Sequence, residues 1–216
     1  MRFAAIIPDR NDRPKLTSFC FRQLERMTLK PDRIFHMNNS PVGSGFDLVS
    51  RIYDGVKQAE AEGFDLCFVI ENDDFYPFDY FYRYEPFFEQ YDFFGQECSW
   101  YYNLRNLTYN RFDHQYRSSL FTTGFKISAL NNFDWPDDSK PFLDIDIWKY
   151  ARHKKRIFTD TGAVGIKTGM GLCGGKGHQF VMRNKDPEMK WLAAHVDSES
   201  FDFYRSLADK LNVCAS

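Results

Sequence analysis

The order of short apolar runs and helical repeats in residues 1–70 is the feature that most restricts the fold. A continuous apolar run with the length of a buried strand occurs at residues 3–7, and two further strand-like runs occur at 34–37 and 64–70. Between these runs, apolar residues recur at steps of three and four over residues 16–27 and 48–59, a spacing typical of amphipathic helices. This β-α-β-α-β order with short connections predicts a parallel sheet with right-handed crossovers.

The rest of the chain predicts further elements of the same class, and 216 residues fit a single domain. An aromatic stretch over residues 78–91 is expected to cover the sheet, and Ser198 is expected to cap a final amphipathic helix. We also expect a strand beginning at Phe93, extended or hairpin structure over 100–112, and short helices at 126–130 and 145–151. The sequence thus predicts one α/β domain with a mostly parallel central sheet flanked by helices.

Charge and cysteine content restrict the partners and the compartment. The 28 basic and 30 acidic side chains give a formal net charge of -2, which provides no attraction of the whole molecule to nucleic acid or anionic membrane. The five cysteines are widely scattered, without the spacing of a zinc site or a disulfide scaffold. No apolar run has the length of a signal peptide or a membrane span. We therefore expect a cytoplasmic protein without a transmembrane segment, of undetermined oligomeric state.

Four polar residues, Glu71, Asn72, Asp73 and Asp74, directly follow the strand expected at 64–70. In parallel sheets, ligands bind beyond the carboxyl ends of the strands. In an extended segment, Glu71 and Asp73 share one side while Asp74 points away. No cation neighbours these two carboxylates in the sequence, so a bound divalent cation or a shared proton is expected between them. Mg²⁺ and Mn²⁺ prefer such oxygen ligands. Taken alone, the four residues are equally well explained as a solvated turn.

These motifs resemble, in the same order, those of the family 2 glycosyltransferases with a GT-A fold. The opening strand and polar turn of that family are similar to Ile6-Ile7-Pro8-Asp9-Arg10-Asn11-Asp12-Arg13-Pro14. Its passage from the first helix to the second strand resembles residues 23–34. Its DXD-type motif corresponds to Glu71-Asn72-Asp73-Asp74, followed here by Phe75-Tyr76-Pro77. The resemblance implies a single GT-A, Rossmann-like domain over residues 1–216, with a nucleotide-sugar-binding half at 1–80 and an acceptor-side half at 81–216 that ends in the C-terminal helix.

The resemblance also implies roles for individual residues and a Mn²⁺ or Mg²⁺ cofactor. Asp73 would ligate the metal on the diphosphate of the donor, preferably a UDP-sugar, and Glu71 would assist at the metal or the ribose. The family also implies donor contacts for Pro8, Asp9 and Arg10 at the base and ribose, and for Asn38 at the nucleoside. Asn72 is a further expected donor-binding residue. Asn38 stands where the family usually has an acid, and Glu71 replaces the usual first Asp; an ordinary turn explains Asn38 equally well.

The second half of the chain supplies the acceptor side of the implied enzyme. An inverting transfer needs a carboxylate that removes the proton of the acceptor hydroxyl. The segment 142–148 resembles the family's acidic helix start, which makes Asp144 the expected base and Asp146 the alternative, unless Asp144 only complements the helix dipole. In the glycine-rich segment 162–178, Lys176 is expected to contact donor phosphates and His178 to complete the metal shell.

Two other functions remain open at this point. A sugar-phosphate nucleotidylyltransferase would need a basic glycine-rich loop after the first strand, where this chain has residues 8–12 instead. A non-catalytic glycan- or nucleic-acid-binding module is suggested by aromatic residues interleaved with arginines over 100–117, because aromatic faces stack on sugars and bases. For the enzyme, the expected acceptor is a saccharide or glycan, or a hydroxylated base in modified DNA.

Overall fold

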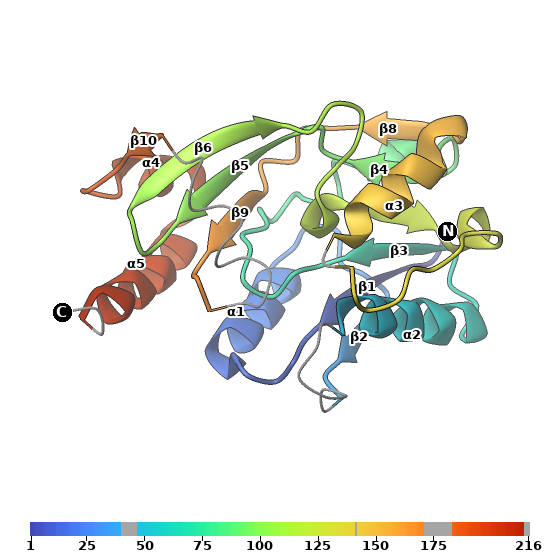
Figure 1. The fold of residues 1–216 in the computed structure, drawn as a ribbon, viewed down its shortest axis with the longest axis horizontal. Coiled ribbons are helices and arrows are strands. Elements are labelled where there is room, and N and C mark those ends of the chain that lie inside the picture. The colour runs from blue at the N-terminus through green and yellow to red at the C-terminus, as the bar shows by residue number, and fades with distance from the viewer. Residues whose placement is uncertain (40–46, 141, 171–182, 214–216) are drawn as a thin grey trace.

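The computed structural model describes residues 1–39, 47–140, 142–170 and 183–213, which form two sheets with helices packed around them (Figure 1). The helices are α1 (Pro14–Glu25), α2 (Leu48–Ala61), α3 (Leu143–Tyr150), α4 (Lys190–His195) and α5 (Ser198–Val213), with short 3-10 turns η1 (Glu85–Phe87), η2 (Leu120–Thr122), η3 (Ile127–Leu130) and η4 (Ala151–His153). The strands are β1 (Phe3–Pro8), β2 (Arg33–Met37), β3 (Leu66–Val69), β4 (Phe93–Gly95), β5 (Cys98–Asn103), β6 (Thr108–Asp113), β7 (Gly124–Lys126), β8 (Arg156–Phe158), β9 (Val164–Lys167) and β10 (Asn184–Lys185).

The central sheet has the strand order β2-β1-β3-β7-β4-β8 within the described residues. Strands β2, β1 and β3 run parallel, as the alternation of strands and helices predicts, and β4 pairs in parallel with β8. Strand β7 is antiparallel to both of its neighbours, β3 and β4. The sheet is therefore mixed, with its parallel part formed by the segments that the sequence predicts most clearly.

A second sheet, with the order β10-β6-β5-β9, lies beside the first (Figure 1). The predicted hairpin is confirmed as the antiparallel pair β5 and β6, while β9 pairs with β5 in parallel. Strand β9 lies in the segment interpreted above as a glycine-rich loop, so that interpretation is wrong for residues 164–167. A strand of four residues is too short to show an alternating pattern in the sequence.

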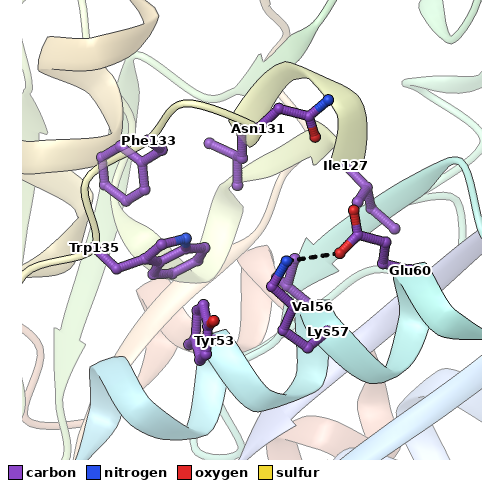
Figure 2. Close-up of a pocket in the computed structure, with 9 residues that line it drawn as sticks. Tyr53, Val56, Lys57, Glu60, Ile127, Asn131, Phe133 and Trp135 are labelled. Carbon is purple, nitrogen blue, oxygen red and sulfur yellow. Dashed lines mark hydrogen bonds and ion pairs between the residues drawn. The ribbon is translucent and has the colours of Figure 1, made fainter.

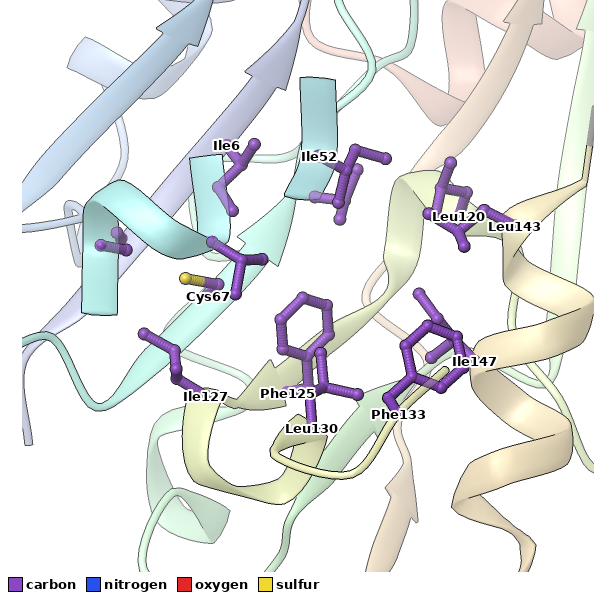
Figure 3. Close-up of a cluster of buried hydrophobic side chains, with 14 of the residues drawn as sticks. Ile6, Ile52, Cys67, Leu120, Phe125, Ile127, Leu130, Phe133, Leu143 and Ile147 are labelled. Carbon is purple, nitrogen blue, oxygen red and sulfur yellow. The ribbon is translucent and has the colours of Figure 1, made fainter. Parts of the chain in front are cut away.

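The two faces of the central sheet bury different apolar clusters. Alternate residues of β1 and β3 point to opposite faces: Ile6 and Cys67 pack with α2, η3 and α3 (Figure 3), while Ile7 and Phe68 pack with α1 and the aromatic segment before β4. The second cluster confirms that residues 78–91 cover the sheet. Its centre is Phe68, whose ring lies 5.2 Å from that of Phe81 and 5.8 Å from that of Phe94.

Helices α4 and α5 cover the second sheet and give a third apolar cluster, which includes Phe19 of α1. The final helix begins at Ser198 as predicted, but its cap is the preceding residue. Asp197 accepts hydrogen bonds from the backbone N–H of Ser200 at 3.0 Å and from its hydroxyl at 2.8 Å. In the part of the chain that the structure describes, no helix is both long and apolar enough to cross a bilayer.

Candidate active site

The candidate site lies at the carboxyl ends of the three parallel strands β1, β2 and β3. Asp9, directly after β1, is only 1% exposed. Its carboxylate accepts hydrogen bonds from Asn11 N at 2.9 Å, Thr17 Oγ1 at 2.8 Å, Asn72 Nδ2 at 3.1 Å and His36 Nε2 at 2.8 Å. Burial alone would raise the pKa of Asp9, but the bonds from His36, Asn11 and Thr17 outweigh it and lower the pKa. Asp9 is thus a charged anchor that holds the ends of the three strands together.

A second charged group lies beside β2. Arg10 donates to Asp47 Oδ1 at 3.1 Å, and the buried Arg51 donates to Asp47 Oδ2 from Nε at 3.0 Å and from Nη2 at 2.8 Å. Arg51 also donates to the carbonyl of Met37, the last residue of β2, at 2.8 Å. This bonding fixes Arg10 against the end of β2, next to Asn38, which is exposed.

The acidic segment after β3 is a turn, because the backbone N–H of Asp74 bonds to the carbonyl of Glu71 at 3.3 Å. The alternation expected for an extended segment therefore does not apply, and the prediction that Asp74 points away from Glu71 is wrong. Asp74 is fully buried; its Oδ1 accepts a hydrogen bond from the backbone N–H of Ile166 in β9 at 2.6 Å. Asn72 is also buried and bonds to Thr17 Oγ1 at 2.9 Å.

Two cations from distant parts of the chain meet these carboxylates, which corrects the expectation that none lies nearby. Arg13 Nη1 donates to Asp73 Oδ2 at 2.8 Å. Lys167, at the end of β9, places Nζ 3.6 Å from Asp74 Oδ1 and 5.2 Å from the centre of the Tyr101 ring. Burial would lower the pKa of Lys167, but the carboxylates, Asp74 first among them, raise it, so the lysine stays charged.

Glu71 is surrounded by more negative than positive charge. Burial raises the pKa of Glu71, Lys167 opposes this, and the charges of Asp73 and Asp144 raise it further. Burial likewise raises the pKa of Asp74 well above its ordinary value, and one oxygen of Asp74, Oδ2, has no hydrogen-bond partner among the described residues. The charge of Asp144, at the start of α3, is the weakest of these influences on Glu71.

The two acids of α3 are separated by the helix. Asp144 lies in the first turn, is 8% exposed, and forms an ion pair with Arg117. Burial raises the pKa of Asp144, opposed by the Arg117 charge. Asp146, two residues on, points to a different side of the helix and pairs with Lys140 at 3.6 Å. Of the two acids, only Asp144 is buried, and only its charge influences the pKa of Glu71.

The remaining predicted site residues have varied positions. Pro8 is buried at the end of β1 and pairs with Met37. Lys176 and His178 lie outside the described residues. Among the described side chains, no group of three or more His, Cys, Asp or Glu is arranged to hold a metal ion. A Mg²⁺ site that uses one or two protein carboxylates needs no such group.

Several site residues were not predicted from the sequence. Arg13 lies within the family-like opening turn, and Lys167 and Arg117 are single basic residues whose partners are distant in sequence. Next to Arg117, Ser119 Oγ bonds to His114 Nε2 at 2.9 Å and also to the hydroxyl of Tyr101. Burial and the Arg117 charge lower the pKa of His114 to about 4, so its ring is neutral near pH 7.

A separate pocket of about 320 Å³ lies between α2 and residues 127–135 (Figure 2). Tyr53 and Trp135 meet edge to face on one side of it, with ring centres 5.4 Å apart. Lys57 and Glu60 form an ion pair of 2.8 Å on the other side. Because Lys126 pairs with Leu66, η3 begins at the amino end of β3. The pocket therefore lies near the amino end of β3, whereas Glu71 follows its carboxyl end.

The likeness to known proteins lies in the fold and not in the sequence. No protein-family model and no curated protein matches the sequence. Among solved structures, residues 1–349 of the S. aureus glycosyltransferase TarS match with a TM-score of 0.52 at 12% identity, over 77% of this chain and 61% of that chain. The same fragment in complex with UDP-GlcNAc gives a TM-score of 0.53 at 12% identity, over 77% and 59% of the two chains. A197 from STIV matches with a TM-score of 0.45 at 13% identity, over 76% and 81%.

This chain spans less than two thirds of the TarS fragment. The arrangement that it shares with TarS is a mixed α/β fold whose central sheet is flanked by helices. The predicted fold class is thereby confirmed: the chain has an α/β fold with a central sheet flanked by helices, similar to that of TarS.

Proposed function

We propose that this protein is a glycosyltransferase that moves a sugar from a nucleotide diphosphate donor, preferably a UDP-sugar, to an acceptor hydroxyl with inversion. The observation that carries the proposal is the acidic turn of Glu71, Asp73 and Asp74, which lies at the end of β3 in a fold similar to that of TarS. Ligands of open α/β sheets bind at this edge. The UDP-GlcNAc complex of TarS supports a nucleotide-sugar donor.

The residues at the turn fit a divalent cation such as Mn²⁺ or Mg²⁺. The raised pKa of Glu71 reflects burial and neighbouring acids that Lys167 only partly offsets, so added positive charge would stabilise the ionised cluster. Glu71 and Asp73 would hold the ion. When bound, it would neutralise charge on the departing diphosphate. Arg13 holds Asp73 in place from the side of α1, and Asp9 keeps Asn72 aligned beneath the turn.

Asp144 is the proposed general base. Its raised pKa, a result of burial, suits a carboxylate that must accept a proton from a hydroxyl. Its ion pair with Arg117 fixes the direction of the carboxylate; as the acceptor oxygen attacks the anomeric carbon, its proton passes to Asp144. Arg10, held by Asp47, would contact the nucleoside from the side of β2 together with Asn38. The acceptor is a saccharide or glycan, with a hydroxylated DNA base as the alternative.

Donor and metal binding are tested by thermal unfolding with a panel of nucleotide sugars, with Mn²⁺, with Mg²⁺ and with EDTA. A ligand that binds only the folded state raises the melting temperature, by an amount that grows with its concentration over Kd. We expect a metal-dependent increase with UDP-sugars that Asp73→Asn abolishes. Asp79→Asn, at a half-buried acid paired with Arg83, is the matched control and should keep the increase. If no donor responds with either metal, the chain is a binding module and not a transferase.

The base is tested by comparing two neighbouring acids of α3. With the donor found above, Asp144→Asn should lower the rate of sugar transfer by at least 100-fold without weakening donor binding, in the range typical of lost acid-base catalysis. Asp146→Asn should stay close to the wild type. The reverse pattern would assign the base to Asp146, and full activity of both variants would remove the acid-base step from the proposal.

A further inference from the structure

The loop between β6 and η2 holds an exposed aromatic side chain in an unfavourable backbone conformation. Gln115 and Tyr116 have φ angles of 50° and 70°, and consecutive left-handed residues without glycine are rare. The Tyr116 side chain is nevertheless 72% exposed, more than any other large hydrophobic residue described. Its ring therefore gains little from burial that could offset the backbone strain.

The surrounding structure holds this loop in place at several points. Glu97 accepts hydrogen bonds from Tyr116 N through its side chain and from His114 N through its carbonyl, both at 2.9 Å. Arg156, at the start of β8, donates from Nη1 to the carbonyl of Tyr116 at 3.1 Å. Asp113 Oδ1 accepts from Gln115 N at 2.9 Å. Strain that the surroundings maintain in this way is characteristic of functional positions.

The loop also leads directly to the proposed base. Arg117 follows Tyr116 in the chain and forms the ion pair with Asp144. The apolar side chains of Phe142 and Ile145, on either side of Asp144 in sequence, are 47% exposed each. Exposed apolar side chains are thus neighbours in sequence of both members of the Arg117–Asp144 ion pair.

We propose that Tyr116 is the stacking platform for a sugar ring of a neutral saccharide acceptor; this inference rests on the proposed transferase function. The apolar C–H face of a sugar ring packs well against an aromatic face, and the phenolic group can bond to sugar hydroxyls. Charge favours a neutral acceptor over a phosphodiester chain. Arg117 is neutralised by Asp144, and the two acids that bond to the loop, Glu97 and Asp113, outnumber Arg156, which bonds to its backbone.

A printed array of neutral, sialylated and phosphorylated glycans with added oligo(dT) spots tests the platform, with fluorescently labelled protein as the probe. We expect wild-type protein to bind one or more neutral glycans, with signals that hardly change between 50 and 300 mM NaCl. Tyr116→Ala should weaken this binding at least tenfold, whereas Tyr116→Trp should stay within about twofold. Tyr82→Ala, at another exposed aromatic residue, before η1, should bind like the wild type. Circular dichroism melts confirm that each variant is folded.

Three outcomes would overturn the inference: wild-type protein that binds no neutral glycan, binding confined to oligo(dT) or phosphorylated glycans, or unchanged binding by Tyr116→Ala. The thermal shift with UDP and Mn²⁺ separates this failure from failure of the transferase proposal. If Tyr116→Ala keeps both the thermal shift and wild-type glycan binding, only the proposed role of Tyr116 as a platform is excluded. Absence of the shift in wild-type protein removes the transferase.

Discussion

Replacement of His114 should make the protein less sensitive to acid. His114 bonds to Ser119 and lies near Arg117, and burial together with the Arg117 charge lowers its pKa from 6.5 to about 4. In the unfolded chain the same ring accepts a proton near pH 6.5. Protonation therefore favours the unfolded state: the stabilising effect of a neutral His114 is complete above pH 6.5, falls as the pH decreases, and is lost near pH 4.

The magnitude follows from the two pKa values. Each pKa unit corresponds to about 1.36 kcal/mol, so at pH 5.0 linkage through a fully buried His114 would lower the free energy of unfolding by at most about 2 kcal/mol. The ring is only half-buried, and solvent screening reduces this to about 1 kcal/mol. His114→Gln keeps a polar partner for Ser119 but binds no proton in this range.

Urea denaturation at pH 7.5 and 5.0 measures this effect. Between these two pH values, the wild type should lose about 1 kcal/mol more of its free energy of unfolding than His114→Gln. His153→Gln, at an exposed histidine of η4, is the control and should follow the wild type. Parallel losses in wild type and His114→Gln would refute the reasoning, because they would mean that the ring takes up its proton equally in both states.

Further substitutions test packing, charge and backbone strain. In Gly124→Ala the new Cβ would lie 2.3 Å from Cε1 of Phe68. Urea titration should therefore show a loss of about 2–3 kcal/mol in the free energy of unfolding. An unchanged free energy would mean that the aromatic cluster shifts freely. Lys167→Met removes the cation 3.6 Å from Asp74 and should lower the free energy of unfolding by about 3 kcal/mol, while Lys167→Arg loses less than half of that; equal losses would exclude charge as the cause. Gln115→Gly relieves a left-handed residue and should raise the calorimetric melting temperature by about 2–4 °C, and a fall would show that the side chain itself stabilises the loop.

The N-terminal half of the fold could be predicted because each element has its own local signal. Strands β1, β2 and β3 are apolar runs, and α1 and α2 repeat apolar residues on one face. Strand β7 has three residues, and nothing in the order of the chain says that it inserts antiparallel between β3 and β4. Strands β8, β9 and β10 have only two to four residues each, so their pairing depends on tertiary contacts that no sequence period reveals.

The candidate site was predictable only for residues next to a recognisable element. The acidic turn follows a clear strand, and Asp144 opens a helix with a familiar pattern. Their cations could not be found in this way, because Arg13 is 60 residues from Asp73 in sequence and Lys167 ends a strand that was itself missed. The expectation for Asp74 failed for a related reason, since a turn bond replaced the extended geometry.

Asp74 and Phe75 also determine how the molecule should come apart. The Asp74 side chain bonds to β9, and the next residue, Phe75, forms an antiparallel bridge with Val164, so one short segment joins both sheets. Neither sheet can separate from the other without exposing a buried carboxylate. Both sheets should therefore unfold together in a single cooperative transition. Motions that open the acidic turn should also displace the C-terminal helices α4 and α5.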